Sequence, residues 1–298
     1  MRDIRISASD APIVIDAHQH VWDVEKVSYP WLTPAAGILH RTHTMEELSP
    51  DLDACGVDAT VLVQSADSVD ETRWMQQVAD AHPRVAAIVG WVPLDDVDRS
   101  IMLLDEYATD PRIVGIRHLI FNEPDEDWLI RPAVQDGFAL LAERGYTFDV
   151  VAASSRHLEH AATIAANHPT LRLVIDHLGT PPVKGGQLTP WAARLADAAE
   201  HPNVYAKLSG LTTVAESPTP HDLAPYVEHA FDVLGAGRIM YGGDWPVSRQ
   251  AGGYQTAWQM TMDLLADRSD GERAAVLGLS AAAFYGIDEL VLRAQAGR

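Results

Sequence analysis

The chain has 298 residues, of which 47% are hydrophobic and 21% are charged, an ordinary composition for a globular protein with a large core. Its formal net charge of −20 disfavours binding to nucleic acid or to an anionic membrane surface. Cys55 is the only cysteine, so neither an internal disulfide nor a cysteine-based metal site is expected. The N-terminus lacks the apolar core of a signal peptide, and no apolar run approaches the ~18 residues of a membrane span. These features predict a soluble cytoplasmic protein.

Short runs rich in Val, Ile and Leu follow one another along the chain, most of them without strict alternation of polar and apolar residues. Such runs are typical of strands that are buried on both faces of a parallel sheet. The expected strands are residues 13–20, 59–65, 85–94, 113–120, 147–152, 171–178, 204–211 and 239–247.

Segments with a helical spacing of apolar residues lie between these runs. The clearest are residues 70–81, 97–107, 131–144, 155–167, 221–234 and 254–266, and short helices are expected at 272–277 and 280–285. Thr44 and Glu47 have the spacing of a capping box at the start of the first helix, which Gly56 is expected to end. Thr189 and Pro190 predict the N-cap and the first residue of another helix.

The alternation of strand and helix, repeated about eight times, implies a parallel sheet with helices outside it. We therefore expect an α/β protein, in which residues 1–298 form a single (β/α)8 TIM barrel domain with a short C-terminal helical tail. An open, doubly wound sheet is the alternative. It is disfavoured because no GxGxxG fingerprint follows the first run.

Two histidines stand near the end of the first expected strand. His18 and His20 are separated by one residue, so in a strand they point to the same face, with Cα atoms about 6.5 Å apart. Two imidazoles in this arrangement can bind a divalent metal ion or a carbonyl oxygen. The HxH pattern alone is a weak signal, and two ordinary buried histidines are the alternative.

Polar residues at the ends of other strands strengthen that signal, because the chemistry of such barrels takes place where the strands end. His177 follows the sixth run and Asp244 follows the eighth, so both are expected to meet His18 and His20 in one pocket. Further candidates for contacts with a substrate are Arg117, His118, Gln64, Trp91, Trp31, Trp128 and Trp245.

Only one of two neighbouring candidates is expected to face the pocket. Arg117 and His118 are adjacent in a strand, so only one of them is expected to face the pocket. Lys207, in the seventh run, is expected to form a structural ion pair. The long aromatic segment 21–43, which carries Trp22 and Trp31, is expected to form a lid or wall over the mouth.

Several motifs in this order are familiar: IDAHQHVWD at 15–23, YPWL at 29–32, GIRHLI at 115–120, DEDWL at 125–129, VIDHLGTPP at 174–182, YAKLSGL at 205–211 and MYGGDWPVS at 240–248. With them the chain resembles the amidohydrolase superfamily, of the amidohydrolase 2 type. Within it the chain is similar to the sugar-lactonase branch, which includes L-fuconolactonase-like and L-rhamnono-lactonase-like enzymes, and to pyrone-dicarboxylate lactonases. The resemblance implies the metallo-dependent hydrolase type of TIM barrel.

The resemblance also implies a reaction. It indicates hydrolysis of the ring ester of an aldono lactone, with Asp244 as the general base on water and His18, His20 and His177 polarising the carbonyl. Members with two metals use a lysine after strand four and a histidine after strand five, and this chain has neither. We therefore expect that no metal is required. If one zinc binds, the expected ligands are His18, His20, His177 and Asp244.

Two other readings remain open. The same barrel and residues suit a zinc-dependent decarboxylase of an unsaturated or aromatic carboxylic acid. A non-enzymatic barrel that binds sugar acids is the second alternative. The expected partner in every case is a small molecule, with neither nucleic acid nor membrane, and a homo-oligomer is compatible with the sequence.

Overall fold

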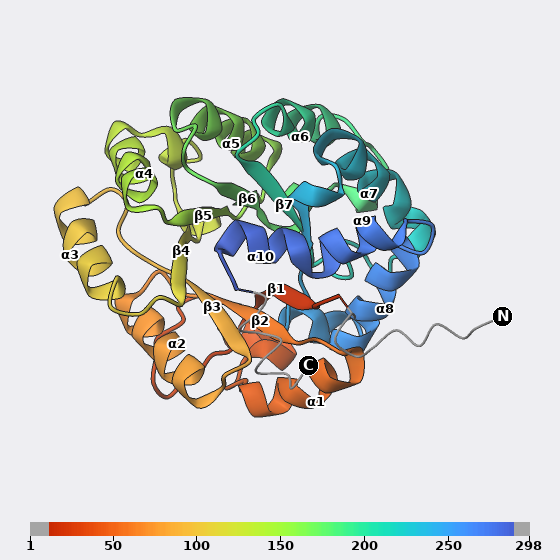
Figure 1. Ribbon diagram of the computed structural model, residues 1–298, viewed down its shortest axis with the longest axis horizontal. Helices are drawn as coiled ribbons and strands as arrows, with labels where there is room; N and C mark the ends of the chain where they lie inside the picture. The colour runs from red at the N-terminus through yellow and green to blue at the C-terminus, as the bar shows by residue number, and fades with distance from the viewer. Residues whose placement is uncertain (1–11, 289–298) are drawn as a thin grey trace.

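The computed structural model describes residues 12–288, and its strands form one parallel eight-stranded sheet in the order β1 to β8 (Figure 1). The last strand returns to the first: Asp244 N donates to His18 O (2.8 Å) and His20 N donates to Trp245 O (2.7 Å). The predicted TIM barrel is confirmed. The strands are β1 Ile15–Gln19, β2 Ala59–Val63, β3 Val85–Gly90, β4 Ile113–His118, β5 Thr147–Val150, β6 Leu173–Ile175, β7 Val204–Leu208 and β8 Ile239–Tyr241.

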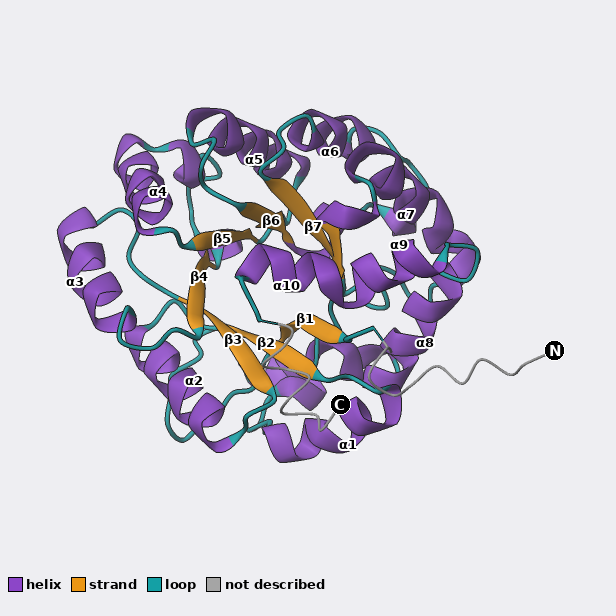
Figure 2. Ribbon diagram, in the orientation of Figure 1, coloured by secondary structure: helices purple, strands orange, loops and turns teal. Residues whose placement is uncertain are grey.

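Helices surround the strands on the outside (Figure 2). They are α1 Met45–Cys55, α2 Val69–Ala81, α3 Val97–Tyr107, α4 Pro132–Arg144, α5 Ser155–Asn167, α6 Trp191–Ala199, α7 Pro220–Leu234 and α8 Tyr254–Leu264, followed by α9 Asp270–Ala274, the π-helical turn η9 Ala275–Leu279 and α10 Ser280–Tyr285. The single domain expected over residues 1–298 includes residues 1–11 and 289–298, which lie outside the described residues.

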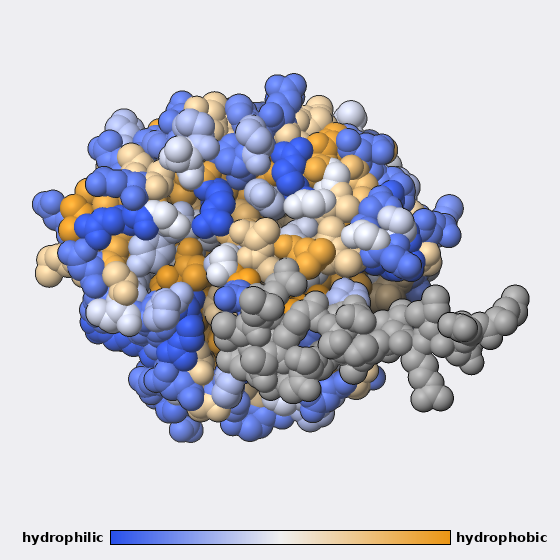
Figure 3. Space-filling view, in the orientation of Figure 1, coloured by the Kyte–Doolittle hydropathy of each residue, from blue (hydrophilic) through white to orange (hydrophobic). Residues whose placement is uncertain are grey.

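The buried apolar residues form one core between the sheet and the helices, another inside the barrel and a smaller third cluster that includes Trp22 and Tyr29. β2, with the sequence ATVLV, is buried along its whole length, as expected for a strand covered on both faces. The inner core includes Ile15, Ala17, Val61, Val63, Val89, Val174, Met240, Phe284 and Tyr285. The last two belong to α10, which lies across the open end of the barrel (Figure 1). On this face, hydrophobic residues gather near the middle and hydrophilic ones dominate the rim (Figure 3).

All eight strands end earlier than the sequence indicated, and two of these ends position candidate site residues. The strand expected at 171–178 ends at Ile175, because His177 and Leu178 have positive φ values of 55° and 51°. The strand expected at 239–247 ends at Tyr241, before Asp244 with a φ of 51°. In both places the backbone leaves the sheet where polar residues or glycine follow the apolar run, at Asp176-His177 and at Gly242-Gly243-Asp244.

Two predicted caps are wrong, and two are confirmed. Thr44 is the N-cap of α1, but its side chain makes no capping hydrogen bond, and the Glu47 carboxylate pairs with Arg41 at 2.6 Å. α6 has Pro190 rather than Thr189 as its N-cap, and the turn before it is closed by Ala192 N and Leu188 O at 2.8 Å. The expected glycine end of α1 is present at left-handed Gly56, and α4 ends in the same way at Gly145, as glycine after a helical apolar pattern predicts.

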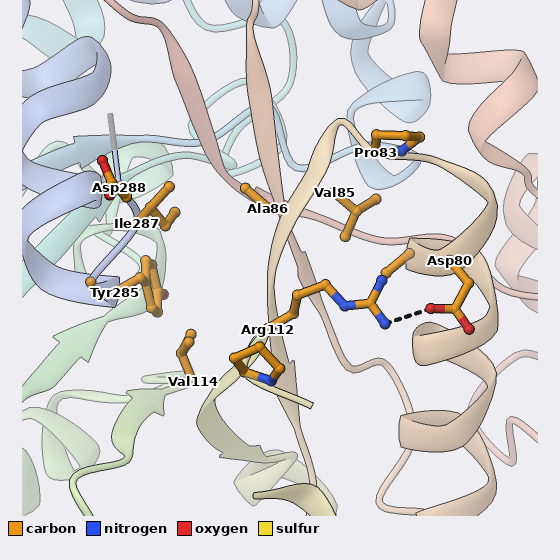
Figure 4. Close-up of a pocket in the computed structure, with 12 residues that line it drawn as sticks. Asp80, Pro83, Val85, Ala86, Arg112, Val114, Tyr285, Ile287 and Asp288 are labelled. Carbon is orange, nitrogen blue, oxygen red and sulfur yellow. Dashed lines mark hydrogen bonds and ion pairs between the residues drawn. The ribbon is translucent and has the colours of Figure 1, made fainter. Parts of the chain in front are cut away.

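The barrel has a cavity at the end where its strands begin. This space of about 470 Å³ lies between the starts of β3 and β4 and the residues at the end of α10. Two of the charged side chains that line it, Arg112 and Asp80, pair with each other at 2.6 Å (Figure 4). Tyr285 of α10 also forms part of its wall.

Candidate active site

A cavity of about 180 Å³ opens at the other end of the barrel. Its walls come from the ends of several strands and from the loops that follow them. The wall residues are His20, Trp22, Trp31, Ser65, Arg117, Leu119, Phe121, Val151, His177, Asp244 and Val247. Side chains from both ends of the chain therefore meet in one small pocket.

His18 and His20 lie at the end of β1 and are both buried. Their rings meet edge to face with centroids 4.9 Å apart. The Nδ1 of His20 donates to Val63 O at 2.7 Å. Because a carbonyl only accepts hydrogen bonds, Nδ1 holds the proton of the neutral ring, and Nε2 is left as an acceptor.

The sequence Gly242-Gly243-Asp244 fits a crowded turn after β8. A Cβ on Gly242 would lie 2.6 Å from the Cβ of His18, and one on Gly243 would lie 2.2 Å from the ring of Tyr254. Asp244 itself has a φ of 51°, a left-handed conformation that aspartate tolerates better than most residues. Its N–H donates to His18 O, so the turn holds the carboxylate against the end of β1.

Asp244 faces the two imidazoles at distances that are too long for direct hydrogen bonds. Its Oδ1 is 3.7 Å from His20 Nε2 and 3.8 Å from His18 Nε2. The Asp244 carboxylate and His20 Nε2 are both hydrogen-bond acceptors, so two groups with lone pairs face each other across a gap. A water molecule, a proton or a metal ion between them would satisfy both.

These three residues fit a single zinc ion. Ligand atoms bound to tetrahedral zinc at ~2.0–2.1 Å are about 3.3 Å apart, close to the separations seen here. Among the described residues, His18, His20 and Asp244 form one group whose ligand atoms lie within 4.8 Å of one another. Two imidazoles and a carboxylate leave a fourth position open, as in catalytic zinc sites. His177 falls in another such group, with His18 and Asp176.

His177 reaches the pocket from the turn after β6. The turn is left-handed at His177 itself, and its ring centroid lies 4.6 Å from that of His18. Its Nδ1 lies 2.9 Å from the hydroxyl of Ser209, which directly follows β7. When this hydroxyl donates to Nδ1, the proton of the neutral ring sits on Nε2, where it can be donated to a ligand.

A layer of buried charges lies directly beneath the imidazoles. Lys207 is in contact with Asp149 at 2.5 Å and with Asp176 at 3.1 Å. Arg117 donates to Asp176 at 3.0 Å and also to the backbone oxygen of Gln64. Two cations thus balance two carboxylates, as buried charges require.

Burial keeps the two β1 imidazoles neutral near pH 7. It lowers the pKa of His18 well below the usual value, and it lowers the pKa of His20 as well. Burial alone would raise the pKa of Asp176, but the nearby Lys207, His18 and Arg117 hold that pKa well below its ordinary value. Asp176 is therefore ionised while the histidine above it is not.

Three predicted contact residues lie away from the cavity wall. Trp91 donates to His118 Nδ1 at 3.1 Å, and His118 stacks on Trp128 with centroids 4.1 Å apart. The other nitrogen of His118 pairs with Glu123 at 2.8 Å. Of the adjacent pair in β4, Arg117 is the one that reaches the cavity.

The remaining predicted residues have mixed positions. Trp31 is part of the wall, and its indole donates to Ser65 O at 2.6 Å. Gln64 is buried behind the wall, where its amide donates to Arg117 O at 3.0 Å. Trp245 is buried next to Asp244 and packs edge to face on His43, with centroids 5.5 Å apart.

Sequence reasoning did not single out several wall residues for substrate contact. Ser65, Leu119, Phe121, Val151 and Val247 line the cavity. Ser65, Leu119, Val151 and Val247 fall in the last residues of the expected strands, and Phe121 directly follows one, so their position in the chain was the available signal. Phe121 is half exposed, at 50%, although it is a large apolar side chain, so it offers an apolar edge to a ligand.

A parallel barrel with two imidazoles on β1 and a carboxylate after β8 defines a hydrolase-type site for a metal or a water nucleophile. The chain belongs to the amidohydrolase family, whose model matches residues 15–287. It is 38% identical over 280 residues to an L-fucono-1,5-lactonase of Burkholderia ambifaria, covering 92% of this chain and 96% of that protein.

A curated sequence and a solved structure from Burkholderia multivorans are also similar to this chain. An L-fucono-1,5-lactonase is 32% identical over 295 residues, covering 92% of this chain and 96% of the relative. A solved amidohydrolase structure with bound zinc has a TM-score of 0.84 and 30% identity, covering 93% of this chain and 100% of that one. The expectation that no metal is required therefore finds no support, whereas residues able to hold one are present.

Proposed function

We propose that this protein is a hydrolase that opens the ring ester of a sugar-derived aldono lactone. Support comes from relatives named as lactonases over nearly the whole chain. The observation that carries the proposal is the placement of Asp244 across a gap from His18 and His20, at the wall of a small pocket.

Asp244 is the proposed general base. A water molecule in the gap between Asp244 and His20 would donate to the carboxylate, which removes its proton as the water attacks the lactone carbonyl. The same carboxyl group then returns a proton to the ring oxygen as the alkoxide leaves. The backbone hydrogen bond from Asp244 N to His18 O at 2.8 Å holds the base in place for both steps.

His177 and His20 have different proposed roles. His177 can present Nε2–H to the oxyanion that forms on the carbonyl oxygen, the type of contact that is worth ~3–4 kcal/mol in measured cases. The proton of neutral His20 is held by Val63 O, so its Nε2 accepts rather than donates. We therefore assign His20 to the water or metal, in place of the oxyanion role expected from the sequence.

A metal ion would be held by His18, His20 and Asp244, whose ligand atoms lie close together. Zinc bound there would supply a Lewis acid for the carbonyl and would lower the pKa of a bound water molecule. Arg117 and Trp31, both in the cavity wall, are proposed to position the lactone, Arg117 through hydrogen bonds and Trp31 by stacking on an apolar sugar face.

A screen of aldonolactones with a pH indicator tests the function, because each ring opening releases an acid. We expect zinc-loaded protein to open at least one six-membered aldonolactone far faster than buffer does. Release of carbon dioxide from an unsaturated or aromatic acid, with no lactone opened, would favour the decarboxylase instead. Tight binding of a sugar acid with neither reaction would favour a binding protein.

A further inference from the structure

Lys207 contacts the candidate site from below, and the proposed reaction gives it no role. It is completely buried in β7 and is held by Asp149 of β5. Asp149 is in turn held by Tyr285, whose hydroxyl donates to Asp149 Oδ2 at 3.0 Å. The ammonium group is therefore fixed from the side of the inner core. Its third neighbour, beyond Asp149 and Asp176, is His18, whose Nδ1 lies 3.0 Å away.

The Nδ1 of His18 has two competing neighbours. Lys207 Nζ lies at 3.0 Å and can only donate. Asp176 Oδ1 lies at 3.2 Å and, when ionised, can only accept. The Nδ1 of a neutral imidazole can either accept from Lys207 or donate to Asp176. If it accepts, the ring proton lies on Nε2, which faces the pocket; if it donates, Nε2 carries no proton.

The geometry at Nδ1 favours the lysine. The contact between Lys207 and Nδ1 has hydrogen-bond geometry, whereas Asp176 Oδ1 has no hydrogen-bond partner despite its short distance to the ring. On the other side of the ring, Arg117 reaches Nε2 only at 3.4 Å and is committed to Asp176 Oδ2 at 3.0 Å. Both contacts have hydrogen-bond geometry, and the one from Lys207 is the shorter.

We propose that Lys207, anchored by Asp149, is a positioning residue that places the proton of His18 on Nε2 when no metal is bound. In that tautomer His18 presents an N–H to the gap beside Asp244, whose Oδ1 lies 3.8 Å from Nε2. Water or a substrate oxygen in the gap then meets a donor at His18 and an acceptor at His20.

A metal ion needs the other tautomer, because a ligating nitrogen must offer its lone pair. His18 would then donate from Nδ1 to Asp176, as metal-bound histidines commonly do to a carboxylate. Lys207 therefore competes with the metal for His18. Its removal strengthens zinc binding, which is the opposite of what loss of an ordinary supporting contact would do.

The test is a double variant, Lys207→Met with Asp149→Asn, which removes both partners of an ion pair and leaves the net charge unchanged. We expect ¹⁵N shifts of the metal-free wild type to show His18 protonated at Nε2, with the signal assigned by its loss in His18→Gln. In the double variant the proton moves to Nδ1, and zinc binds about tenfold more tightly, on the scale of other contacts to metal-bound histidines. Lys184→Met, a change at a lysine of the turn Val183–Gly185, should alter neither result.

Two results would overturn the proposal. One is a folded double variant in which the His18 tautomer and the zinc affinity both match the wild type. The other, which needs no variant, is a metal-free wild type with His18 protonated at Nδ1. These readouts contain no lactone, so they stand even if the proposed lactonase function fails. One further expectation does rest on that function. Without metal, the double variant should lose more in kcat than it changes in KM.

Discussion

At the scale of single residues, the environment of each acid decides what it can do. Glu71 of α2 is completely buried and accepts hydrogen bonds from Ser65 N at 2.9 Å, from Ser65 Oγ at 2.6 Å and from Ala66 N. These bonds fix the loop that contains Ser65, whose backbone oxygen accepts a hydrogen bond from the Trp31 indole. Burial outweighs these hydrogen bonds and raises the pKa of Glu71 to about 7.

The raised pKa predicts a pH-dependent stability. The carboxyl group binds its proton more tightly when folded than when unfolded, so its contribution is greatest below pH 4.5 and is lost as the pH rises to about 7. Over that range the free energy of unfolding of the wild type, relative to Glu71→Gln, should fall by about 3 kcal/mol. Urea unfolding of both proteins at several pH values measures it. A difference that does not change with pH would show that Glu71 titrates normally.

At the scale of elements, the turn after β8 is where the fold positions the candidate base. The two glycines before Asp244 let the chain pass close to β1 and α8, and each lacks room for a side chain. Within the segment 239–247 only Ile239, Met240 and Tyr241 form a continuous apolar run, and Gly242, Gly243 and Asp244 follow it directly. The glycine pair was the signal that it offered.

The turn can be tested with one methyl group. Gly243→Ala would place a Cβ 2.2 Å from the Tyr254 ring and 2.8 Å from Asp16 Oδ2. We expect a loss of ~1–3 kcal/mol in unfolding free energy, as for other overpacked sites, with reduced turnover because Asp244 is displaced. Gly237→Ala is the matched control, since a Cβ there meets nothing within 4 Å. Equal stability and turnover in the two variants would contradict this account.

Sequence periodicity gave most of the elements, because barrel strands and amphipathic helices have distinct apolar patterns. It also located His18, His20, His177 and Asp244 at strand ends. It could not show that Trp91, His118 and Trp128 form a stack away from the cavity, because strand register and loop paths decide which face each ring occupies. The sequence could not predict the tautomer of His20 either, because that tautomer depends on a hydrogen bond to the carbonyl of Val63, which is distant in sequence.

At the scale of the whole molecule, the candidate site joins the two ends of the barrel chain. β1 and the turn after β8 meet through backbone hydrogen bonds and share the proposed metal ligands. No helix among residues 12–288 is long and apolar enough to cross a membrane. The homo-oligomer considered from the sequence stays a prediction, which light scattering can test.

Metal binding at that junction should stabilise the entire fold. A ligand that binds only the folded state adds about 2.7 kcal/mol at a free concentration of 100 Kd. Adding zinc to chelator-treated protein is therefore expected to raise the thermal midpoint. His20→Ala should remove most of this increase, while His118→Ala, at a histidine outside the cavity wall, should retain it. An equal increase in both variants would place the metal elsewhere.

The most direct measurement of the central claim is the turnover of an aldonolactone by wild type and by Asp244→Asn, with the fold of each confirmed by circular dichroism. Loss of the general base is expected to lower kcat by about 10²–10⁴-fold. A folded Asp244→Asn variant whose kcat stays within a few-fold of the wild type would contradict the claim that Asp244, beside the β1 histidines, activates water.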